Sequence, residues 1–186
     1  MVNSVIFHEG KSDKIFLKLL ISELGLDSSK LRFIAMKGKS YFWDSEHPMY
    51  QVVKNDVEEE NITKLLFIVD ADDEKNDEKY GGYENTKREL RNIIKQLELT
   101  EYADLYITCN KKKKMGYLEA LILLTIPQPQ KNCIQDFLNC SEFKSKENHK
   151  AILNQIYKIA YPNAPFNFTH QYFDELKQKL TDLLSE

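Results

Sequence analysis

The sequence predicts an α/β protein in which a parallel sheet is flanked by helices and followed by a helical C-terminal region. Three observations lead to this fold class. Short apolar runs, each too short for a helix, alternate with segments of helical periodicity over the first 110 residues. This alternation is typical of a parallel sheet with a helix between successive strands. From residue 116 onward, the periodicity is mainly helical.

Four apolar runs predict the strands of this sheet. We expect them at residues 2–8, 31–36, 64–69 and 105–109. The run at 64–69, "KLLFIV", is the clearest of the four. Because every connection contains a helix, the carboxyl ends of the strands should lie along one edge of the sheet, where ligands bind in such folds.

Apolar residues at helical spacing predict the helices. The first should begin at Ser12 or Asp13 and end at Gly25, a common helix terminator. Residues 41–50 are expected to be irregular. Further helices are expected around residues 50–57, and at 84–97, 116–125, 133–139, 147–160 and 170–184. We interpret residues 1–115 as an α/β domain and residues 116–186 as a mainly helical region packed on it.

Composition limits the class of protein. The net charge of −3 excludes a strongly basic protein, although a local basic patch remains compatible with nucleic-acid binding. Residues 1–110 carry 21 acids and 15 bases, and the remainder carries 8 acids and 11 lysines, so acids concentrate among the strands. Three cysteines without a CxxC motif argue against a disulfide framework and against structural zinc. With no apolar run long enough for a bilayer, we expect a cytoplasmic protein that does not enter a membrane.

Acidic residues follow two of the predicted strands. Glu9 and Gly10 come after the first strand, and Asp70 and Asp72 come after the third. Parallel strands place them at one rim, and side-chain alternation along a strand can aim Asp70 and Asp72 in one direction. Crowded carboxylates at this rim repel each other, and their pKa values rise. A divalent cation relieves this repulsion, and oxygen ligands suit Mg²⁺ or Mn²⁺. For one strand end alone, helix capping would be the better explanation, but the agreement of two strand ends favours a metal site.

The stretches "IFHEGKSD" and "LLFIVDADDE" resemble the two signatures of the Toprim (topoisomerase–primase) family. The resemblance covers roughly residues 3–110 and implies Mg²⁺ binding at Glu9, Asp70 and Asp72, with phosphoryl transfer on nucleic acid. A further stretch, "KKKKMGYLEALILL", resembles small stand-alone Toprim-like proteins related to OLD-type nucleases. That likeness makes Glu119 a fourth metal-ligand candidate. Asp13 matches an acid that the family often carries three residues after the glycine.

Lysines also follow the predicted strands. Lys37 and Lys39 flank a glycine after the second strand, where they could neutralise a phosphate or act as a general base. The alternative is a simple exposed loop. The nucleic-acid backbone contacts are expected from Lys11, Lys111, Lys112, Lys113 and Lys114. The alternative for the four-lysine run is a solvated turn, and the alternative for Lys11 is an ion pair with Asp70 or Asp72.

A supporting set completes the predicted site. Gly10 is expected to keep the turn after the first strand free of a side chain. Asp13 could support Glu9, bind the metal through water or cap the following helix. Asp73 could tune a second metal ion or belong to a surface loop.

We therefore expect a Mg²⁺- or Mn²⁺-dependent phosphoryl-transfer protein, nuclease-like and acting on DNA or RNA, with Glu9, Lys37 and Lys39 as the catalytic candidates. The alternative is a non-catalytic module that binds metal and nucleic acid, or binds a protein partner such as a separate ATPase. A receiver-like protein is disfavoured, because receivers carry the acidic pair after the first strand, whereas here it follows the third. The sequence leaves the oligomeric state open.

Overall fold

The computed structural model describes residues 3–75, 77–141, 146–160 and 166–185. Its described part contains one parallel sheet with the strand order β2-β1-β3-β4. The strands are β1 (Ser4–His8), β2 (Leu31–Ala35), β3 (Lys64–Asp70) and β4 (Ala103–Thr108). This sheet, its flanking helices and the helical C-terminal region confirm the predicted fold class.

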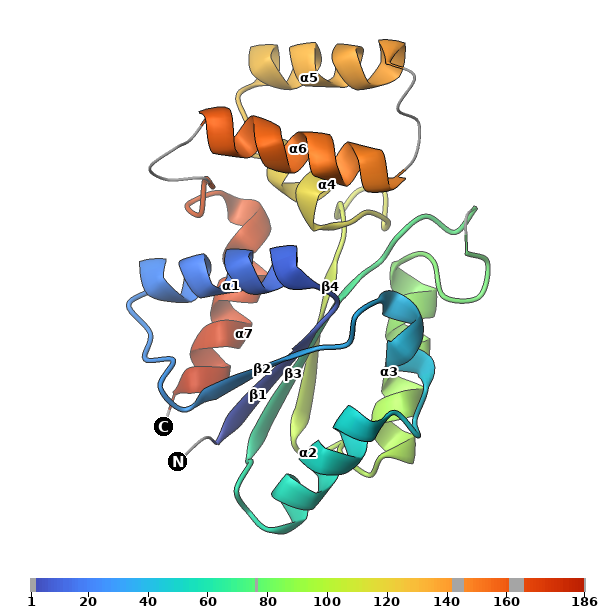
Figure 1. Ribbon diagram of the computed structural model, residues 1–186, viewed down its shortest axis with the longest axis vertical. Helices are drawn as coiled ribbons and strands as arrows, with labels where there is room; N and C mark the ends of the chain where they lie inside the picture. The colour runs from blue at the N-terminus through green and yellow to red at the C-terminus, as the bar shows by residue number, and fades with distance from the viewer. Residues whose placement is uncertain (1–2, 76, 142–145, 161–165, 186) are drawn as a thin grey trace.

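Helices cover both faces of the sheet (Figure 1). On one face lie α1 (Lys11–Glu23) and α7 (Asp174–Leu184), and on the other lie α2 (Pro48–Glu58) and α3 (Tyr83–Gln96). Side chains alternate along a strand, so β3 serves both layers. Leu66 and Ile68 belong to the core under α1 and α7, whereas Leu65 and Phe67 belong to the core under α2 and α3.

Three further helices lie beyond the carboxyl ends of the strands (Figure 1). They are α4 (Leu118–Leu123), α5 (Gln128–Cys140) and α6 (Lys146–Ala160). Buried residues of all three, such as Leu121, Leu138 and Leu153, join the same apolar core as α1 and α7. The C-terminal helices thus close over the rim where the sequence predicts the site.

Some boundaries differ from the sequence expectation. The helix expected from residue 133 begins at Gln128, because Pro129 is tolerated within a first helical turn. Residues 39–43, partly within the region expected to be irregular, form a 3₁₀ helix, η1 (Lys39–Trp43), and a second one, η2 (Gln171–Phe173), precedes α7. Val2, the expected first strand residue, lies outside the described residues.

Across the described helices, none is both long enough and apolar enough to cross a membrane.

Candidate functional site

The ends of β1 and β3 bring two of the predicted acids together. These strands are hydrogen-bonded neighbours, with Phe7 paired to Phe67. Glu9 follows β1 directly, and its Oε1 accepts a 2.9 Å hydrogen bond from the backbone N–H of Asp70. The Glu9 carboxylate therefore lies across the end of β3, at the rim that parallel pairing predicts.

The Asp70 carboxylate is held by contacts from two helices. Only 4% of the residue is exposed. Its Oδ1 accepts a hydrogen bond from the backbone N–H of Leu118 at 3.1 Å, and its Oδ2 accepts one from the Nζ of Lys150, also at 3.1 Å. Thus α4 and α6 both reach the acid at the end of β3.

Glu119 also reaches this rim. It lies in α4 and is 1% exposed. Asn154 Nδ2 donates to its Oε1 at 3.4 Å, and Lys150 Nζ lies 3.8 Å from its Oε2. Oε2 is buried and accepts no hydrogen bond within the described part of the chain. Asp70 and Glu119 therefore share one ammonium group.

Sequence reasoning missed Lys150 and Asn154. They lie four residues apart in α6 and so share one helix face. That spacing is the one local signal for them, and it is shared by many surface helices. Only the packing of α6 over the rim gives the two side chains a role.

Asp72 reaches its position by a different route from the one expected. We expected strand alternation to aim Asp70 and Asp72 in one direction, but β3 ends at Asp70, and Asp72 has left-handed backbone with φ of 56°. Its N–H and C=O bond to Gly116 at 2.9 and 3.2 Å. Its Oδ2 lies 3.5 Å from Lys39 Nζ. A bridge to the turn after β4, rather than strand pleating, therefore fixes Asp72.

The electrostatics of the rim favour additional positive charge. Burial, followed by the negative charge of Asp70, raises the pKa of Glu9 to about 8. The same two causes raise the pKa of Asp13 to about 7. Burial lowers the pKa of Lys150, but the attraction of Asp70 and Glu119 outweighs it, so the net shift is upward. Lys150 consequently stays charged, but its charge does not offset the effect of burial and of Asp70 on the pKa values of Glu9 and Asp13.

The acids of the rim have the right chemistry to bind a cation, but their side chains are not arranged around a common point. Carboxylate oxygens suit Mg²⁺ or Mn²⁺, and Oε2 of Glu119 has an unused acceptor. However, no group of three or more His, Cys, Asp or Glu residues in the described chain is arranged to hold a metal ion. Lys150 and Lys39 supply the neighbouring positive charges instead. A metal held by Glu9, Asp70, Asp72 and Glu119 requires Lys150 to move aside.

The lysines after β2 have different environments. Lys37 is exposed, whereas the side chain of Lys39 is only 10% exposed. Lys39 Nζ donates to the carbonyl oxygens of Ala71 and Tyr80 at 3.2 and 3.0 Å, and to Thr86 Oγ1 at 3.3 Å. Burial lowers its pKa. These bonds give Lys39 a structural task in joining η1 to the loop after β3.

The four-lysine run forms an exposed turn, closed by a bridge between Asn110 and Met115. Lys111 lies 4.0 Å from Glu175, and Lys114 Nζ lies 4.6 Å from the ring centre of Tyr83. Lys11 is an exposed residue at the start of α1. The turn follows β4 and thus lies at the end of the sheet that carries Glu9 and Asp70, the acidic rim.

The predicted supporting residues Gly10, Asp13 and Asp73 make local contacts. The Gly10 N–H donates to Asp13 Oδ2 at 2.7 Å, so Asp13 caps α1 from its third position rather than starting the helix. Gly10 itself is extended, with φ of −154°, and an added Cβ would make only an ordinary 3.9 Å contact with Asp13. The expected steric need for glycine is therefore wrong. Asp73 Oδ1 accepts from the N–H of Lys75 in a local turn.

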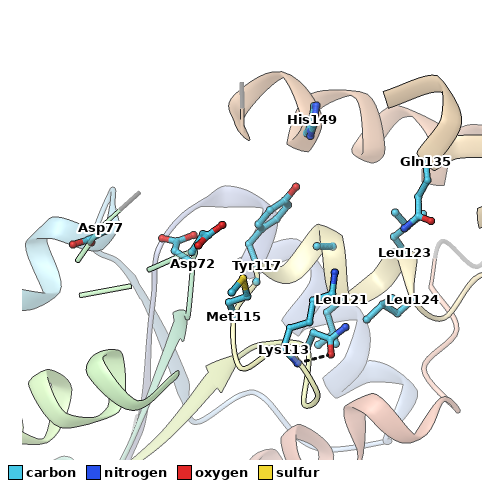
Figure 2. Close-up of a pocket in the computed structure, with 14 residues that line it drawn as sticks. Asp72, Asp77, Lys113, Met115, Tyr117, Leu121, Leu123, Leu124, Gln135 and His149 are labelled. Carbon is cyan, nitrogen blue, oxygen red and sulfur yellow. Dashed lines mark hydrogen bonds between the residues drawn. The ribbon is translucent and has the colours of Figure 1, made fainter. Parts of the chain in front are cut away.

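A pocket of about 530 Å³ opens beside Asp72 (Figure 2). Its lining comes from the loop after β3, the turn after β4, and α4, α5 and α6. Asp72 and Tyr117 both border it, so the pocket is continuous with the acidic rim. Sequence reasoning gave no indication of this cavity, because its walls come from five separate segments.

Comparison with protein-family models, with curated proteins and with solved structures found no match for this chain.

Proposed function

We propose that this protein is a Mg²⁺- or Mn²⁺-dependent phosphoryl-transfer protein of the nuclease type, acting on DNA or RNA, with a Toprim-like α/β region. The observation that carries the proposal is the convergence of Glu9, Asp70 and Glu119 on one rim. Glu9 lies across the end of β3 at Asp70, and Asp70 and Glu119 share the single ammonium group of Lys150. The resemblance of the strand-end sequences to the Toprim signatures adds support.

Glu9, Asp70, Asp72 and Glu119 would hold the cation. When bound, it would supply Lewis-acid polarisation of a phosphate and activation of water. The chain's own residues would do the rest. Lys150 pairs with both Asp70 and Glu119 while no cation is present, and the lysines of the turn after β4 would attract the phosphate backbone.

Isothermal titration of Mg²⁺ and Mn²⁺ tests the metal. Asp70→Asn and Asp72→Asn should each abolish binding, whereas Asp104→Asn should retain it. Asp104 is a matched control because it pairs with Lys179 on the surface. Circular dichroism should show the same fold for all three variants.

Cleavage of labelled DNA and RNA strands then tests the chemistry. We expect cleavage that needs Mg²⁺ or Mn²⁺ and disappears in Asp70→Asn and in Asp72→Asn. Cleavage that continues in both variants would contradict this mechanism.

A second candidate function is a non-catalytic binding module. It is favoured by one observation: Lys150 already serves as counter-ion to two of the acids, so the cluster is partly satisfied without metal. Tight nucleic-acid binding in EDTA, with no cleavage in Mg²⁺ or Mn²⁺, would establish this function over the first. Binding to a separately encoded ATPase would do the same for a protein partner.

A further inference from the structure

The pocket beside Asp72 has an apolar wall that the proposed chemistry does not use. Met115, Ala120, Leu121, Leu123 and Leu124 form this wall. Its volume of about 530 Å³ lies in the range of small-molecule sites. A charged phosphate would not be stabilised by an apolar surface, so the pocket suits an apolar part of a ligand.

Two ring side chains border the same space. Tyr117 extends from the loop before α4 toward α6, where His149 lies (Figure 2). The Nε2 of His149 is buried and makes no hydrogen bond to the described residues. A ligand with an apolar face could pack on the wall beside these two rings.

The pocket is tied to the acidic rim by direct contacts. Lys150 Nζ lies 5.1 Å from the ring centre of Tyr117 and 3.1 Å from Asp70 Oδ2. Asp72 lines the pocket and lies beside Lys39. A group bound in the pocket would therefore lie close enough to the rim to belong to the same nucleotide chain as a phosphate bound there.

We propose that this pocket binds one unpaired nucleobase of the strand whose phosphate lies at the acidic rim; this rests on the proposed function and adds a substrate class to it, namely single-stranded nucleic acid. Aromatic side chains and apolar surface bind base faces without regard to sequence. The three acids of the lining, Asp72, Asp73 and Asp77, would repel a phosphate but accept hydrogen bonds from base amino groups. Lys113, which also lines the pocket, could contact the adjoining phosphate.

The test compares two labelled single strands of equal length by fluorescence anisotropy, one with normal bases and one with abasic sugars throughout. Both carry the same phosphate charge, so any difference reports on the bases. In EDTA, where turnover does not contribute, the wild type should bind the normal strand about tenfold more tightly or better.

Variants then place the effect in the pocket. Ala120→Trp fills the cavity, and Tyr117→Ala removes a ring. Each variant should weaken binding of the normal strand by a similar factor and leave binding of the abasic strand unchanged. Tyr102→Ala is the matched control: Tyr102 is 41% exposed and precedes β4, at the opposite edge of the sheet. Thermal melting of each variant checks its folding.

The outcomes separate this inference from the function on which it rests. Equal binding of the two strands, with metal-dependent cleavage retained, would overturn the base subsite and leave the phosphoryl-transfer function standing. Equal weakening of both strands by the pocket variants would also overturn it. Binding of neither strand, in EDTA or in Mg²⁺, would overturn the subsite together with the nucleic-acid substrate.

Discussion

Lys150 in α6 donates a 3.1 Å hydrogen bond to Asp70 at the end of β3, 80 residues earlier in the chain. The same ammonium group lies 3.8 Å from Oε2 of Glu119. One side chain from the C-terminal helices thus serves as the shared counter-ion of two buried acids of the candidate site. Stability of the rim and access of a cation to it are consequently linked.

Lys150→Met should destabilise the protein by about 2 kcal/mol, because it leaves two buried acids without a counter-ion. The estimate stays below the range for a fully buried pair, since the Lys150 side chain is 26% exposed. Urea unfolding measures the loss. Lys179→Met, which breaks the surface pair with Asp104, should cost less than about 1 kcal/mol. Equal losses in the two variants would contradict this role for Lys150.

Stability in EDTA should fall by about 2 kcal/mol as the pH rises from 6.5 to 8.5. The pKa of Glu9 is raised to about 8 and that of Asp13 to about 7, so the folded state holds protons that the unfolded state has released. Their stabilising contribution is complete below their unfolded pKa values and is lost as the pH passes their folded values. Burial of His8, whose pKa is lowered to about 4, opposes this trend only between pH 4 and 6.5.

The control for this pH profile is Glu9→Gln, which cannot ionise. Melting temperatures measured across the same pH range should decline less in this variant than in the wild type. A wild-type profile that rises between pH 6.5 and 8.5 would contradict the prediction.

Lys39→Met should destabilise the fold by about 1–3 kcal/mol, because the carbonyl oxygens of Ala71 and Tyr80 lose a shared donor. Hydrogen exchange should increase in the loop between β3 and α3. Lys37→Met is the matched control: Lys37 is exposed and two residues away, and its substitution should change stability by no more than about 0.5 kcal/mol. If the two variants behave alike, Lys39 does not hold this loop.

Gly81→Ala should destabilise the protein by about 2 kcal/mol or more. An added Cβ would lie 2.5 Å from the carbonyl oxygen of Asp77 and 2.7 Å from that of Asp73, where backbone cannot give way cheaply. Gly10→Ala should cost less than about 1 kcal/mol, because that position is extended and open. Chemical unfolding of both variants checks the contrast. A larger loss at Gly10 would restore the glycine requirement that the sequence suggested.

The sequence by itself determined the fold class and the placement of Glu9 and Asp70 near each other. Both follow from local patterns: apolar runs define strands, and helical connections make the strands parallel, so their ends share one rim. Glu119 was found through a resemblance in sequence, but its arrival at the rim depends on how α4 packs.

Only the tertiary structure decided what surrounds those acids. Lys150 comes from a helix whose sequence carries no sign of a distant acid, and Asp72 is positioned by Gly116 rather than by strand alternation. Lys37 and Lys39 look equivalent in sequence, yet one is exposed and the other is enclosed. The pocket likewise needs five segments at once. Local periodicity specifies which residues are apolar, but contacts between distant segments depend on how the helices pack over the sheet.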